Sequence, residues 1–138
     1  MKSGSPLCYS DAMDLTELFL HETDLVQVAA GESVFKEGDP GNIMYVLMKG
    51  EANIVVGSAI VEKAKPGAML GELALVDDVK RTATVMAVTD CALVPIDVRR
   101  FLFLIQETPN FALHVMKVIA ERLRNMDVML REAQEYIA

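Results

Sequence analysis

The chain has 138 residues, the length of one domain, and 52% of them are hydrophobic, which is enough to build a core. Thirteen Lys and Arg residues against 20 Asp and Glu residues give a net charge of −7. This charge disfavours a broad basic face for nucleic acid or for an anionic membrane surface. Any anion that the chain binds must therefore be held by a local group of residues.

Cysteine usage and the N-terminal sequence predict the compartment. Cys8 and Cys91 are far apart and have no metal-type spacing, which indicates reduced thiols rather than a disulfide scaffold. The first residues form no apolar signal region, and no run of 18 apolar residues predicts a membrane span. We expect a cytoplasmic protein with a flexible N-terminal arm over residues 1–10 and a single domain over residues 11–138.

Short apolar runs between turn residues predict β-strands from about residue 24 to residue 97. The predicted strands are Leu25–Val28, Ser33–Lys36, Ile43–Met48, Ala52–Val56, Ala59–Ala64, Ala83–Val88 and Cys91–Ile96. The connections are too short for crossover helices, so we expect a mainly β fold with flanking helices. Its centre is predicted to be an antiparallel, jelly-roll-like β-roll of about eight strands. Only the stretch Gly71–Val76 predicts a short helical turn within it.

Helices are predicted on both sides of the roll. Asp11–Leu20 has apolar residues at helical spacing, Asp97 is a predicted N-cap for a helix to about Gln106, and Pro109 opens a longer helix. Apolar residues at heptad spacing form a seam along this last helix: Ala112, Met116, Ile119, Leu123, Met126, Leu130, Ala133 and Ile137. Two interpretations stay open. The seam packs on the chain's own roll, or its distal half pairs with a second copy in a homodimer.

A local anion site is predicted where a glycine precedes the short helical turn. After Gly71, the backbone N–H groups of that turn point in one direction and are suited to bind a phosphate. Arg81 lies across a short loop and offers paired donors to two phosphate oxygens, and Thr82 adds a hydroxyl. Since Glu72 would repel a phosphate, its carboxylate is better suited to accept from a ribose hydroxyl.

Other interpretations of the same residues stay open at this point. Arg81 could pair with Asp77 or Asp78 at the surface, a contact worth about 0–1 kcal/mol. A cupin-like β-roll enzyme would need clustered metal-ligating histidines, whereas His21 and His114 are far apart in the sequence. A third alternative is a degenerate module that only dimerises. The residues themselves predict no catalytic residue and no metal site.

The segment Gly71-Glu72-Leu73-Ala74-Leu75, followed by Arg81-Thr82-Ala83-Thr84-Val85, resembles the phosphate-binding cassette of cyclic nucleotide-binding domains. These domains are the sensors of catabolite-activator-type regulators, cyclic nucleotide-dependent kinases and cyclic nucleotide-gated channels. The upstream segments 30–41 and 44–52 are also similar to that family, and the resemblance covers about residues 25–125. It implies a β-roll that binds a 3′,5′-cyclic nucleotide as a regulatory ligand, without enzymatic activity and without a cofactor.

The resemblance also implies roles for individual residues. Arg81 would pair with the cyclic phosphate, and Glu72, with the Gly71 backbone, would bind the ribose 2′-hydroxyl. The implied backbone donors are Leu73, Ala74, Thr82 and Ala83. The candidate lid over the base, on the C-terminal helix, is Arg122, Asn125, Met126 and Asp127. The resemblance favours cAMP over cGMP and implies that the ligand repositions this helix.

The chain departs from the family pattern at two positions beside the cassette. Lys80 stands where proline is frequent, and Leu70 stands where an aromatic residue is frequent. No DNA-binding, kinase or channel segment is recognisable. We therefore expect no direct contact with nucleic acid and an unknown downstream protein partner, whether the chain is a stand-alone sensor or part of a larger protein.

Overall fold

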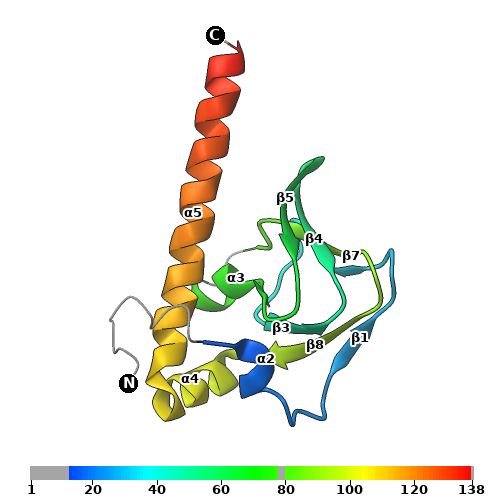
Figure 1. The fold of residues 1–138 in the computed structure, drawn as a ribbon, viewed down its shortest axis with the longest axis vertical. Helices are drawn as coiled ribbons and strands as arrows, with labels where there is room; N and C mark the ends of the chain where they lie inside the picture. Colours follow the sequence, from blue (N-terminus) through cyan, green and yellow to red (C-terminus); the bar gives the residue numbers. More distant parts are fainter. Residues whose placement is uncertain (1–12, 78–79, 138) are drawn as a thin grey trace, which may run out of the picture.

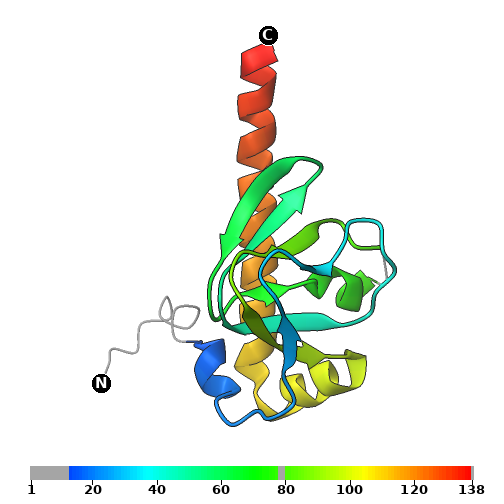
Figure 2. The same ribbon diagram turned by 90° about the vertical axis from the view of Figure 1, so that its right-hand side faces the viewer.

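The computed structural model describes residues 13–77 and 80–137, so the predicted arm over residues 1–10 lies outside the described residues. A β-roll forms the body of the molecule, and a long C-terminal helix, α5 (Pro109–Ile137), runs along one side of it (Figure 1). In both views the C-terminal end of α5 extends beyond the roll (Figure 2). Among the described helices, none is both long and apolar enough to cross a membrane.

Within the described residues, eight strands form two antiparallel sheets of four strands each, which confirms the predicted β-roll. In the first sheet the order is β1 (Val26–Val28), β8 (Cys91–Ile96), β3 (Met44–Lys49) and β6 (Met69–Leu70). In the second sheet the order is β2 (Ser33–Phe35), β7 (Thr84–Ala87), β4 (Ala52–Val56) and β5 (Ala59–Ala64). All seven predicted runs are strands. The additional strand, β6, has only two residues and is too short to show an apolar period.

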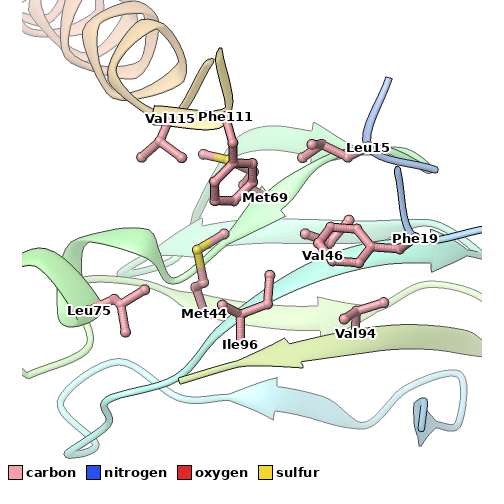
Figure 3. Close-up of a cluster of buried hydrophobic side chains, with 10 residues drawn as sticks. All are labelled: Leu15, Phe19, Met44, Val46, Met69, Leu75, Val94, Ile96, Phe111 and Val115. Carbon is pink, nitrogen blue, oxygen red and sulfur yellow. The ribbon is translucent and has the colours of Figure 1, made fainter. Parts of the chain in front are cut away.

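Two apolar clusters lie on opposite faces of the first sheet, because successive side chains of a strand alternate between its faces. Met44 and Val46 of β3 face the helices, and Leu47 faces the inside of the roll. The cluster on the helix side is shown in Figure 3 and consists of Leu15, Phe19, Met44, Val46, Met69, Leu75, Val94, Ile96, Phe111 and Val115. The cluster inside the roll is Leu47, Ala52, Ile54, Ala64, Leu70, Val85, Ala87, Cys91 and Leu93.

Three helices begin close to their predicted starts, but in the described part of the predicted stretch Asp11–Leu20 only Leu15–Leu18 is helical. Asp14 caps α2 (Leu15–Leu18), and the Asp97 carboxylate accepts from the Arg100 N–H at 2.8 Å at the start of α4 (Val98–Glu107). The short turn after Gly71 is α3 (Glu72–Asp77). These helices cover the first sheet and bring the start of α5 onto it.

The base of α5 packs on the roll mainly through residues outside the predicted heptad seam, although the seam residue Ile119 also packs against the core. Phe111 and Val115 are buried, whereas the seam residues Met116, Leu123 and Leu130 are 57%, 70% and 60% exposed. These three residues therefore do not pack on the chain's own roll, and the first of the two interpretations is wrong at their positions. Pairing with a second copy stays a prediction.

Candidate functional site

A cavity of about 200 Å³ lies between the second sheet, α3 and α5. It is lined by all seven predicted ligand-binding residues: Gly71, Glu72, Leu73, Ala74, Arg81, Thr82 and Ala83. Apolar side chains of the second sheet form much of its wall, namely Phe35, Ile54, Val56, Val61 and Val85. The cavity is thus an apolar chamber with a small number of charged groups, as is typical of small-molecule sites.

Arg81 is buried at this cavity, and both terminal nitrogens of its guanidinium form hydrogen bonds. Its Nη2 donates to the Ile43 carbonyl at 2.8 Å, and its Nη1 donates to the Gly71 carbonyl at 3.3 Å. The Phe35 ring covers one face of the guanidinium, with Cζ 4.1 Å from the ring centroid. Neutral carbonyls and an aromatic face orient the cation without neutralising its charge.

The third guanidinium nitrogen of Arg81 is unsatisfied. Its Nε is buried and has no hydrogen-bond partner in the described part of the chain, and Arg81 forms no ion pair there. Surface pairing with Asp77 is therefore not observed, and Asp78 lies outside the described residues. Burial lowers the pKa of the Arg81 guanidinium, partly offset by Tyr45 and Asp39. A buried cation with a free donor favours an anionic ligand.

The guanidinium occupies space that is free because two neighbouring residues are glycines without a Cβ. Gly71 has φ of +78°, and a Cβ there would lie 2.5 Å from Arg81 Nη1. A Cβ on Gly41 would overlap the other side of the guanidinium. The sequence predicts Gly71 as a site residue, whereas Phe35 and Gly41 lie in a segment that resembles the family but has no predicted role at the site. These two belong to the segment between residues 33 and 43, which only the folded roll brings to Arg81.

Glu72, the first residue of α3, is buried, and its Oε1 accepts from Arg122 Nη1 of α5 at 2.8 Å. Arg122 also donates to both carboxylate oxygens of Glu62 and to the Met69 carbonyl. Burial disfavours the charged guanidinium of Arg122, but Glu62 and Glu72 outweigh this effect and raise its pKa. This cluster links α5 to β5, β6 and α3.

The candidate lid residues on α5 are only partly brought to the cavity. Arg122, Asn125 and Met126 line it, and so does Met129, which the sequence analysis missed. Asp127 does not line it and instead pairs with Arg131 at 3.0 Å on the exposed surface. Helical spacing explains the difference, since residues three, four and seven after Arg122 share its face and residue five does not.

A sequence model of the cyclic nucleotide-binding domain matches residues 25–108, which is more than half of the chain. The chain belongs to this family. The matched region contains both sheets, α3 and Arg81, and with them most of the residues that line the cavity. This membership sets aside the cupin-like alternative.

The chain is also similar to individual proteins. The chain is 31% identical over 118 residues to lysophospholipase NTE1 of Chaetomium globosum, covering 80% of this chain and 8% of that protein. It is 29% identical over 132 residues to the cyclic AMP receptor protein of Thermus thermophilus, covering 92% of this chain and 61% of that protein. The crystal structure of the Thermus thermophilus catabolite activator protein superposes with a TM-score of 0.74 at 27% identity, covering 94% and 63% of the two chains. The chain thus corresponds to only part of each of these relatives.

Proposed function

We propose that this chain is a non-catalytic sensor of a 3′,5′-cyclic nucleotide, with cAMP favoured over cGMP. The observation that carries the proposal is the buried Arg81 guanidinium in the cavity wall, with which no carboxylate of the described residues forms an ion pair. A cyclic phosphate supplies the missing negative charge and oxygens that accept hydrogen bonds from a guanidinium. The apolar walls suit a ribose and a purine base. The cyclic AMP receptor protein among the relatives supports cAMP by its name.

In the proposed complex each part of the nucleotide meets a different part of the cavity. Arg81 binds the cyclic phosphate together with the backbone N–H groups of Leu73, Ala74, Thr82 and Ala83. Glu72 and the Gly71 backbone bind the ribose 2′-hydroxyl. Asn125 and Met126 of α5 cover the base, and Met129 extends this cover.

We propose that ligand binding signals by changing the fraction of molecules in which α5 is closed over the cavity. A ligand that contacts both the roll and α5 binds more tightly when the helix is closed over the cavity, and it shifts the equilibrium toward that state. The contact from Arg122 to Glu72 makes α5 sensitive to events at the ribose site. We further propose that residues 11–138 act as one domain in the cytoplasm. Its partners would be a second copy, through the α5 seam, and a downstream protein.

Calorimetric titration of the 138-residue chain with cAMP, cGMP and 5′-AMP tests this function. We expect binding of both cyclic nucleotides, tighter for cAMP, and much weaker binding of 5′-AMP. The open phosphate of 5′-AMP has a different shape and carries more charge, so it fits the Arg81 site poorly. Failure to bind either cyclic nucleotide at millimolar concentration would contradict the proposal and favour a degenerate, dimerising module.

A further inference from the structure

Glu62 is a charged residue of the cavity wall to which the proposed function assigns no part. It lies on β5, away from the cassette in sequence. Its carboxylate accepts twice from the Arg122 guanidinium, from Nε to Oε1 at 2.9 Å and from Nη2 to Oε2 at 3.1 Å. Two parallel bonds to one edge fix both the plane and the direction of a guanidinium. Glu62 therefore determines where the rest of the Arg122 head group points.

The opposite corner of this guanidinium points to Glu72. Arg122 Nη1 donates to Glu72 Oε1 at 2.8 Å, and the Glu72 side chain is only 5% exposed. Within the described residues no hydrogen bond reaches Oε2 of Glu72, so this oxygen remains available to a ligand hydroxyl. Breaking a buried ion pair is costly, so a turned Arg122 would draw the Glu72 carboxylate with it.

We propose that Glu62 is a positioning residue for ribose recognition, because it orients Arg122 and, through Arg122, the carboxylate of Glu72. The inference rests on the proposed function, in which Glu72 accepts a hydrogen bond from the ribose 2′-hydroxyl. Glu62 acts through Arg122. Its removal should therefore weaken the recognition of the ribose 2′-hydroxyl by Glu72, and it should have a smaller effect on the binding of the cyclic phosphate by Arg81.

Titration with cAMP and with 2′-deoxy-3′,5′-cAMP tests this role. The ratio of the two dissociation constants measures what the 2′-hydroxyl contributes, and the wild type should prefer cAMP. In Glu62→Gln we expect this preference to fall by roughly fivefold or more, as a charge-assisted hydrogen bond loses its alignment. Affinity for the 2′-deoxy analogue should change less. Glu62→Asp, which keeps the charge on a shorter side chain, should give an intermediate preference.

Glu121→Gln is the matched control, because it removes the same charge from the neighbour of Arg122 on α5 without touching the cluster. It should leave the preference unchanged. An unchanged preference in Glu62→Gln, or a wild type that binds both ligands equally, would overturn the role of Glu62. A wild type that binds neither nucleotide would instead contradict the proposed function. Thermal unfolding of each variant shows that it is folded, so that equal weakening of both ligands identifies a merely structural role.

Discussion

At the scale of single residues, the contacts of Arg81 and its lack of an ion pair within the described residues together characterise the site. Two carbonyls and the Phe35 ring hold the guanidinium, yet no carboxylate of the described residues forms an ion pair with it. In contrast, Arg122 is neutralised by Glu62 and Glu72. The two arginines therefore have different proposed roles: the buried Arg81 binds the anionic ligand, and the partly buried Arg122 joins the helix to the roll.

Gly71→Ala should damage both the fold and the site. The residue has φ of +78°, which L side chains avoid, and the added Cβ would press on Arg81 Nη1. We expect a loss of about 1–3 kcal/mol in the free energy of unfolding, together with at least about tenfold weaker cAMP binding, equivalent to ~1.4 kcal/mol. Urea unfolding and calorimetric titration measure these two effects.

Gly57→Ala is a suitable control for the conformational part of this effect. Gly57 also has positive φ, of +61°, but a Cβ there meets no atom within 4 Å. This variant should lose stability and keep its affinity for cAMP. Unchanged cAMP affinity in Gly71→Ala would contradict the assigned contact with the guanidinium.

At the scale of elements, local sequence predicts most of the fold. The seven strand runs, the turn that becomes α3 and the Asp97 cap each have their signal in a few adjacent residues, and the structure confirms them. The packing face of α5 is not predicted in this way. Heptad spacing identifies a row of apolar residues along the helix, but it does not say which part of the molecule packs against that row. Phe111 and Val115 pack on the roll, while Leu123 and Leu130 remain exposed.

The exposed seam leads to a prediction of self-association. If α5 pairs with a second copy through Leu123 and Leu130, their double change to aspartate should weaken the dimer by at least about 3 kcal/mol, because burial of each leucine contributes about 1.5–3 kcal/mol. Sedimentation velocity, with and without cAMP, measures this change. Val128→Asp is the matched control, since Val128 is 50% exposed on the other side of the helix. A wild type that stays monomeric at high concentration would contradict the homodimer.

At the scale of the whole molecule, an acidic chain of net charge −7 places an unneutralised cation inside an apolar cavity. The contiguous part of this site, from Gly71 to Ala83, is predictable because its residues are neighbours in the sequence. Phe35, Gly41 and Glu62 are not predictable in the same way. Phe35 and Gly41 lie in a segment that resembles the family, but nothing in that segment assigns them a role, and only closure of the roll brings them and Glu62 to the arginines.

The most direct test of the central claim is calorimetric titration of Arg81→Ala with cAMP beside the wild type. The account predicts cAMP binding weaker by roughly 1.5–3 kcal/mol, the contribution expected from a hydrogen-bonding partner of a charged group. Arg131→Ala, which removes an equal charge from the exposed end of α5, should bind as the wild type does. An Arg81→Ala variant that is folded and keeps the affinity of the wild type would contradict the account.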